Sequence, residues 1–297
     1  MNVIYAQLGW GDGLSHVNFK GLMMTVLLVM KEDVLKEVWS TVKGLEREMV
    51  DAMKEMIPIR AMAPENGGDG EMERAAFLEG LLRESGVDRV ERRDVKDERV
   101  SSGLRPNLIA YYYGEDRSRT YWIISHMDTV PPGDVSLWNT PPFEAVVRNG
   151  KIYGRGTEDN GQGIISSIFA VKALASLGIR PKVSVGLALV ADEEVGSKYG
   201  IIRLIEEGVF KPTDLILVPD AGNEDGSMIE VAEKGMLWLK VTIRGKQVHA
   251  STPQKGVNAH KIGMRFALSL HDALSTLSLI HISEPTRPLY ISYAVFC

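Results

Sequence analysis

The sequence has almost no cysteine, since the one cysteine is Cys297, the last of 297 residues. A disulfide within the chain is therefore excluded, and so is a thiolate zinc site. Any metal would have to be held by His, Asp and Glu side chains. The scarcity of cysteine also favours the cytoplasm as the compartment of this protein.

Long hydrophobic runs and long basic runs are missing as well. The apolar stretch 22–30 is too short to span a bilayer, and no small-residue cleavage site follows it, so neither a membrane span nor a signal peptide is expected. A net charge of −5 provides no electrostatic footprint for nucleic acid or an anionic membrane. With 44% apolar and 25% charged residues, the composition is that of a soluble globular protein with one large domain or two ordinary ones.

Strand patterns alternate with helix patterns along most of the chain, which predicts an α/β sheet with helices on both faces. Apolar residues spaced by three and four predict helices over 31–57, 71–84, 163–177 and 198–207. Short apolar runs predict strands over 108–113, 121–125, 183–190 and 215–218. The pair Asn149-Gly150 is a type I′ turn signal and predicts a hairpin across 145–153.

Ionisable side chains come directly after several predicted strands, at the sheet edge where ligands bind in open α/β folds. His126 and Asp128 follow the strand 121–125. A histidine there can offer a ring nitrogen to a metal, while the carboxylate takes the other ring N–H and fixes the tautomer. A structural histidine is the alternative, because a His-x-Asp pair also occurs by chance.

Asp159 lies in the glycine-rich turn 154–161, just before the predicted helix 163–177. Glycines let the backbone turn tightly and bring a carboxylate into a confined site. Asp159 could equally be the N-cap of that helix. The glycine spacing does not match a dinucleotide-binding fingerprint.

Two further sets of carboxylates follow strands. Asp192, Glu193 and Glu194 follow 183–190, where one carboxylate can bind metal while its neighbour acts as general base. Asp220 follows 215–218. Solvated loop carboxylates and an ordinary turn residue are the respective alternatives. Taken together, one histidine and several carboxylates suit zinc, manganese or cobalt, and a bridging carboxylate can hold two metals about 3.5–4 Å apart.

Short motifs carry a family resemblance, and they occur in this order: SHMDTVP (125–131), YGRGTEDNG (153–161), ADEEVGS (191–197), VPDAG (218–222) and GKQVHASTP (245–253). Over residues 31–274 the sequence resembles the co-catalytic zinc hydrolases, which include acetylornithine deacetylase, succinyl-diaminopimelate desuccinylase, aminoacylase, carboxypeptidase G and several dipeptidases. The resemblance implies a zinc-peptidase-like mixed sheet, two zinc ions, and hydrolysis of an amide or peptide bond in a small substrate.

The resemblance also implies roles for particular residues. His126 and Asp220 are expected to bind the first metal, Asp159 to bridge both metals, and Glu194 to bind the second. Asp128 would orient His126. The peptide bond that follows Asp159 is expected to be cis.

Two catalytic roles follow from the same resemblance. Glu193 is expected to act as the general base. His249, in the smaller domain, would reach the active site of a partner subunit in a homodimer and support the oxyanion; an exposed surface histidine is the alternative. Aspartate at position 220, where other members have glutamate, favours a dipeptide over an N-acyl amino acid as substrate.

The sequence departs from the family pattern at two points. Many members have a lysine at the position of Gly161. The family's last ligand of the second metal is a histidine near the C-terminus, and no counterpart is found here. A catalytically inactive metal-binding or scaffold homologue is therefore the competing interpretation, and so is an inactive fragment of an enzyme. Retention of Glu193 argues for the enzyme.

The chain is expected to comprise four segments. Residues 1–29 are interpreted as an upstream extension, residues 30–236 as a catalytic domain without its C-terminal half, and residues 237–276 as the start of an α+β lid or dimerisation domain. Residues 277–297 are interpreted as a non-native tail, because LSLIHISEPTR at 277–287 resembles a translated sequencing adapter. An ordinary C-terminal strand and loop is the alternative.

Overall fold

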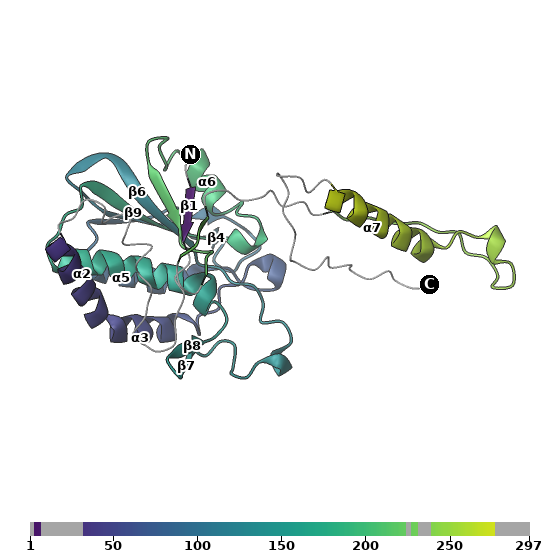
Figure 1. The fold of residues 1–297 in the computed structure, drawn as a ribbon, viewed down its shortest axis with the longest axis horizontal. Helices are drawn as coiled ribbons and strands as arrows, with labels where there is room; N and C mark the ends of the chain where they lie inside the picture. The colour runs from purple at the N-terminus through teal and green to yellow at the C-terminus, as the bar shows by residue number, and fades with distance from the viewer. Residues whose placement is uncertain (1–2, 7–31, 224–226, 231–238, 277–297) are drawn as a thin grey trace. The chain divides into compact units, whose positions relative to one another are not determined.

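A computed structural model of the chain describes residues 3–6, 32–223, 227–230 and 239–276 (Figure 1). The chain divides into two compact units, Met1–Val231 and Ala232–Cys297, and each is described by itself. Among the described residues, no helix is long and apolar enough to cross a membrane.

The first unit is built on one mixed sheet of seven strands, in the order β11-β1-β10-β6-β9-β5-β2. The four central strands, β1, β10, β6 and β9, are adjacent in the sheet and pair in parallel. β5 pairs antiparallel with β9 and β2, and β11 pairs antiparallel with β1. The mixed α/β sheet expected from the sequence is confirmed. The strands are β1 (Val3–Ala6), β2 (Arg89–Arg92), β5 (Leu108–Tyr112), β6 (Asp116–His126), β9 (Val183–Val190), β10 (Leu215–Val218) and β11 (Ile229–Glu230).

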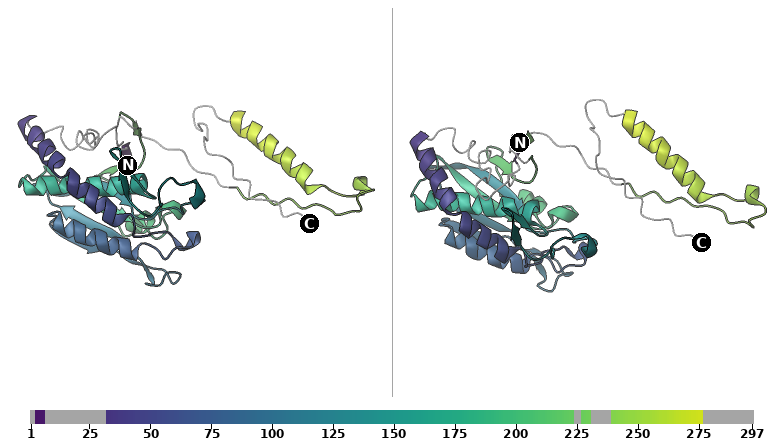
Figure 2. Two further views of the ribbon diagram at one scale, coloured as in Figure 1. Left: turned by 90° about the horizontal axis from the view of Figure 1, so that it is seen from below. Right: turned by 60° about the horizontal axis from the view of Figure 1, so that its bottom comes forward.

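Helices cover both faces of this sheet. Along β6, Tyr121 and Ile123 pack into a core with α2, α3, α4 and α5, whereas the alternate residues Trp122 and Ile124 pack into a second core with Leu204 of α6. Figures 1 and 2 show α2, α3 and α5 on the same side of the sheet. The helices are α2 (Glu32–Gly44), α3 (Glu46–Met56), α4 (Met72–Glu84), α5 (Gly163–Ser176) and α6 (Ile201–Glu206).

The single helix predicted over 31–57 is wrong, because two helices meet there at Leu45. Gly44 ends α2, and glycine is among the poorest helix formers. Leu45 has φ −88° and ψ 0°, which turns the chain before α3 begins. The apolar spacing survives the break, and Val38, Val42, Met49 and Met53 are all buried.

The predicted hairpin is confirmed by β7 (Val146–Arg148) and β8 (Lys151–Tyr153). Its turn residues have positive φ, 51° at Asn149 and 73° at Gly150, as a type I′ turn requires. A second small ladder pairs β3 (Val95–Lys96) with β4 (Leu104–Arg105).

The described part of the second unit contains α7 (Ala259–Thr276) and an isolated bridge between Lys246 and Val257. Of the expected upstream extension, only β1 is described, and it pairs with β10 and β11. Most of that segment, the expected domain boundary near 237 and the expected non-native tail lie outside the described residues. The interpretation of these segments stays a prediction.

Candidate metal centre

Three neighbouring strands deliver ionisable side chains to one edge of the sheet. His126 is the last residue of β6, Glu193 and Glu194 follow β9, and Asp220 follows β10. Because β10, β6 and β9 are adjacent and parallel, their carboxyl ends lie together. Asp159 joins them from η3 (Thr157–Gln162), the turn that leads into α5.

The centre of the cluster is His126, Asp159 and Asp220, whose ligand atoms all lie within 4.8 Å of one another. His126 Nε2 is 2.8 Å from Asp159 Oδ1 and 3.6 Å from Asp220 Oδ2. Glu193 Oε2 lies 4.0 Å from the same nitrogen. The structure therefore brings together the expected ligands of the first metal and places the expected general base at their side.

The other ring nitrogen fixes the orientation of His126. Nδ1 lies 3.0 Å from the backbone carbonyl oxygen of Asp128 and 3.4 Å from its carboxylate. The 2.8 Å contact with Asp159 requires a proton on Nε2, whereas a ring that keeps only its Nδ1 proton could offer the Nε2 lone pair to a metal ion. Both acceptors of Asp128 thus face Nδ1, the main-chain oxygen being the nearer, and the orienting role expected for Asp128 stays a prediction.

The Asp128 carboxylate also makes contacts that the sequence did not predict. It accepts the backbone N–H groups of Glu193 and Glu194, each at 3.0 Å. Asp128 is fully buried, so these charge-assisted bonds are shielded from water. One residue thus connects the loop after β6 to the loop after β9.

A buried arginine also holds the loop that follows β6. Arg74 of α4 donates from Nη1 to the carbonyl of Met127 and from Nε and Nη2 to the carbonyl of Ile59. Burial lowers its pKa to about 10, which still leaves the guanidinium charged at neutral pH. Arg74 was not recognised from sequence, because a single arginine on an amphipathic helix carries no local signal.

Carboxylates crowd the centre, and their pKa values reflect it. Burial and the neighbouring Asp159 raise the pKa of Glu194 to about 7. Burial also raises the pKa values of Glu193 and Asp220. His126 is buried, yet Asp128 and Asp159 raise its pKa well above the ordinary value.

The donor set fits divalent metal ions. One imidazole and several carboxylates form a nitrogen and oxygen ligand set that suits zinc, manganese or cobalt. Glu194 Oε1 is buried and has no hydrogen-bond partner among the described residues. A buried carboxylate oxygen without a donor is costly unless a cation meets it, and a metal ion beside Asp159 would do so.

Two residues that sequence reasoning missed hold Asp220 in place. Asn160 Nδ2 donates to Asp220 Oδ1 and, at 3.3 Å, to the carbonyl of Pro219. Gln162 Nε2 donates to the same carbonyl at 3.1 Å. The Asp159–Asn160 peptide bond is cis, as expected. At Gly161, where many family members have lysine, an added Cβ would overlap the carbonyl oxygen of Gly156.

His249 belongs to the second unit. Its side chain is exposed, and its Nδ1 lies 2.8 Å from Ser251 Oγ. Its expected role at the oxyanion of a partner subunit stays a prediction.

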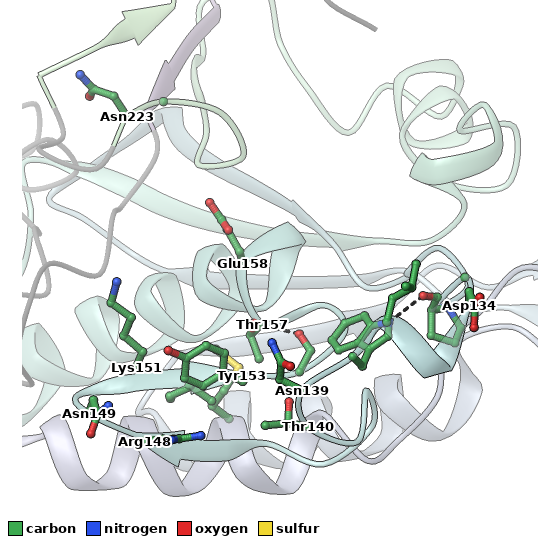
Figure 3. Close-up of a pocket in the computed structure, with 18 residues that line it drawn as sticks. Asp134, Asn139, Thr140, Arg148, Asn149, Lys151, Tyr153, Thr157, Glu158 and Asn223 are labelled. Carbon is green, nitrogen blue, oxygen red and sulfur yellow. Dashed lines mark hydrogen bonds between the residues drawn. The ribbon is translucent and has the colours of Figure 1, made fainter. Parts of the chain in front are cut away.

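The first unit has a cavity of about 1280 Å³ (Figure 3). Thr157 and Glu158, which directly precede Asp159, line one part of it. The β7–β8 hairpin and the loop 132–140, with Trp138, line other parts. The indole Nε1 of Trp138 donates to the carbonyl of Pro132 at 2.8 Å, which fixes the ring in this wall.

Comparison with known proteins identifies the family. Residues 122–291 match the model of Peptidase family M20/M25/M40. The chain belongs to this family. A metallohydrolase of Methanocaldococcus jannaschii, described as uncharacterized, is 42% identical over 237 residues, which are 77% of this chain and 58% of that protein. Succinyl-diaminopimelate desuccinylase 2 of Shewanella loihica is 31% identical over 169 residues, which are 55% of this chain and 44% of that protein.

Solved M20 structures share the fold. Human carnosine dipeptidase 1 superposes with a TM-score of 0.56 at 24% identity, over 63% of this chain and 41% of that chain. The dipeptidase Dug1p of Saccharomyces cerevisiae gives a TM-score of 0.53 at 22% identity, over 63% and 41%. The chain spans 58% of the length of the Methanocaldococcus jannaschii protein and less than half of the Shewanella loihica desuccinylase.

Proposed function

We propose that the protein is a metal-dependent hydrolase that cleaves the amide or peptide bond of a small substrate, a dipeptide or an N-acyl amino acid. The observation that carries this proposal is the cluster of His126, Asp159 and Asp220 within 4.8 Å, with Glu193 Oε2 4.0 Å from the histidine nitrogen. Membership of the M20 family supports a metallohydrolase, and the cluster provides side chains suited to bind the metal and to move a proton.

The residues divide into two ligand sets that share one carboxylate. His126, Asp159 and Asp220 would hold one zinc ion, and Asp159 with Glu194 would contribute to a second. When bound, such a pair of ions lowers the pKa of a water molecule and polarises the scissile carbonyl group. The unpartnered Oε1 of Glu194 supports the second position.

Glu193 is suited to move the proton. Its side chain is 48% exposed, so it reaches the open edge of the sheet, yet its backbone is fixed by Asp128. In the metal-free site, burial raises the pKa of Glu193. Glu193 takes the proton from the attacking water and delivers it to the leaving amine.

Two observations support a small substrate with a peptide or acyl-amino bond. The cavity lined by Thr157 and Glu158 is large enough for a dipeptide or an N-acyl amino acid. The relatives include desuccinylases, and the fold neighbours include dipeptidases. The homodimer and the cytoplasmic location that the sequence indicates stay predictions.

The test uses the product of the complete gene, loaded with zinc. We expect two zinc ions per chain and hydrolysis of dipeptides or N-acyl amino acids. Glu193→Gln should keep the zinc and lower kcat about 10²–10⁴-fold, the contribution of a general base. Glu206→Gln, an exposed residue on α6 paired with Arg203, is the matched control and should leave kcat unchanged.

Failure to bind zinc, or turnover that survives in Glu193→Gln, would overturn the proposal. A protein that binds two zinc ions but cleaves neither substrate class would favour the scaffold interpretation.

A further inference from the structure

The loop that carries Glu193 and Glu194 has an irregular backbone. It runs from Ala191 to Tyr199, between β9 and α6. Asp192 has φ +68° and Ser197 has φ +62°, which is the left-handed region that side chains other than glycine seldom adopt. Contacts from outside the loop must therefore hold Asp192, the residue directly before the expected general base.

The Asp192 side chain turns into the protein and is 1% exposed. Its Oδ2 accepts the backbone N–H of Tyr199 at 3.1 Å, which closes the loop on itself. Its Oδ1 lies 3.2 Å from Nη1 of Arg105, an ion pair that lacks the alignment of a hydrogen bond. Arg105 is thus the cation that meets this carboxylate.

Arg105 is fully buried at the end of β4 and faces three carboxylates. Its Nε and Nη2 donate to the two oxygens of Glu71, which immediately precedes α4. Its Nη1 lies 3.5 Å from Asp97 and 3.2 Å from Asp192. The fork to Glu71 fixes the plane of the guanidinium, so the position of Nη1, and with it that of Asp192, is set by α4 and β4.

Asn107 holds the two ends of the same loop. Its Oδ1 accepts the N–H of Ala191 at 3.0 Å, and its Nδ2 donates to the carbonyl of Tyr199 at 2.9 Å. The segment from Arg105 to Asn107 therefore contacts the loop at its start, at its strained residue and at its end.

We propose that Arg105 is a positioning residue of the hydrolytic reaction, because its buried ion pair with Asp192 holds the loop in the conformation that aims Glu193 and Glu194 at the metal centre. This inference rests on the proposed function. A buried ion cluster adds little net stability compared with apolar packing, so stability alone gives no reason for three carboxylates around one arginine. A requirement for a fixed loop geometry would explain why this buried cluster is present.

The test compares Arg105→Lys, Arg105→Met and Asp192→Asn with the control Arg99→Met. Lysine keeps the charge but cannot bind Glu71 through a fork while it also reaches Asp192. Asp192→Asn keeps an oxygen for the Tyr199 N–H and removes the charge that faces Arg105. Arg99 is a suitable control because, like Arg105, it pairs with Asp97 and lies over the Tyr199 ring. Unlike Arg105, it forms no ion pair with Asp192.

The first readout is hydrogen exchange in the metal-free protein. We expect exchange of residues 191–199 to rise about tenfold in Arg105→Lys and Asp192→Asn, as local opening does, while β6 and β9 exchange as in the wild type. Arg99→Met should leave exchange of residues 191–198 unchanged. Exchange that rises equally throughout the sheet, or does not rise in the loop, would overturn the inference, whatever the wild type hydrolyses.

The second readout is the kinetics of the zinc-loaded product of the complete gene. We expect kcat to fall about 10–100-fold in Arg105→Lys and Asp192→Asn, as for residues that orient a metal site, with KM within about threefold of wild type. The double variant Arg105→Lys/Asp192→Asn should be no slower than the slower of the two single variants, because both substitutions break the same Arg105–Asp192 contact. Additive losses, or an unchanged kcat in Arg105→Lys, would overturn the inference.

The two readouts separate the two proposals. If the wild type does not hydrolyse either substrate class, the proposed function fails and the exchange experiment still decides the role of Arg105 in the loop. If Arg105→Met does not fold, Arg105→Lys and Asp192→Asn give the answer, since each keeps a polar side chain in the buried cluster.

Discussion

The carboxylate of Asp128 accepts the backbone N–H group of Glu193 at 3.0 Å, and so ties the loop after β6 to the loop after β9. The same carboxylate accepts the N–H of Glu194, also at 3.0 Å. His126 and the two glutamates are delivered by different strands, yet their relative positions depend on this one side chain. The affinity of the site for metal should therefore depend on Asp128, although Asp128 itself is not expected to bind the metal.

Replacing Asp128 by asparagine tests this dependence. An amide has one oxygen acceptor, so one of the two N–H groups would face an NH₂ donor instead of an acceptor. We expect zinc affinity and kcat/KM to fall about 10–100-fold, the usual effect of losing a partner that orients metal ligands. Competition with a chelator measures the affinity.

The control for that experiment is Asp116→Asn, at the opposite end of the same strand. The Asp116 carboxylate accepts from nearby Ser118, and Asp116 is far along β6 from His126. Zinc affinity should be unchanged in this variant. A loss smaller than about threefold in Asp128→Asn would show that the two N–H contacts do not set the geometry.

Much of the metal centre could be predicted because it is local in sequence. Each apolar strand ends in the polar side chain that the site needs, so His126, Glu193 and Asp220 could be placed at one sheet edge without coordinates. The strand 183–190 has the predicted bounds, because it is mostly apolar and buried along nearly its whole length.

Other features could not be predicted because they join elements that are distant in sequence. Arg74 and Arg105 come from α4 and β4, and nothing near either residue indicates which loop it will contact. The task of the Asp128 carboxylate depends on how β9 ends, and this also cannot be read from the residues around position 128. The break at Leu45 could not be predicted from the apolar spacing, because that spacing continues across it.

Asn160 provides a second test of how the ligands are held. Its Nδ2 donates to Asp220 and to the carbonyl of Pro219, so Asn160→Ala should free Asp220. Asn160→Asp should be worse, because a carboxylate would then face a carboxylate. We expect zinc affinity to fall about tenfold in the alanine variant and further in the aspartate variant.

Gln162→Ala is the comparison for this pair. Gln162 donates to the Pro219 carbonyl but not to Asp220, so its removal should weaken zinc binding less than Asn160→Ala does. Zinc content after dialysis against graded chelator concentrations gives the ranking. Equal losses in Asn160→Ala and Asn160→Asp would contradict the role given to the amide.

Asp97 gives the buried cluster around Arg105 a dependence on pH. Its hydrogen bond with Arg99 is the main reason that its pKa is lowered to about 2. The unfolded value is about 3.9, so this carboxylate stabilises the folded state above that pH, and the stabilisation disappears as pH falls from about 4 to about 2.

Asp97→Asn should therefore lower the free energy of unfolding near neutral pH by on the order of 1 kcal/mol, because Arg99 is partly exposed and water screens the pair. The difference from wild type should shrink below about pH 4 and vanish near pH 2. Urea unfolding at several pH values measures it. A difference that stays constant across this range would show that packing, and not charge, explains the loss. The variant Asp97→Asn/Arg99→Met should lose little more than either single variant.

Gly200 lies close to Ala191, which is two residues before Glu193, the expected general base. A Cβ at Gly200 would overlap the carbonyl oxygen of Ala191, the residue before Asp192. Gly200→Ala should therefore destabilise the fold by about 1–3 kcal/mol, the range for overpacking a filled interior. Because Ala191 would have to move, kcat should fall as well.

Gly80→Ala is the matched control, and the opposite sign is expected. Gly80 lies within α4, and an added Cβ would meet no atom within 4 Å. Alanine there should stabilise the protein by about 0.5–1 kcal/mol through its higher helix propensity, and kcat should not change. Thermal unfolding of the two variants, measured beside their kinetics, gives the comparison. If both glycine replacements had the same sign, the close approach of Gly200 to Ala191 would not be what constrains position 200, and the loop that carries Glu193 would have room to adjust.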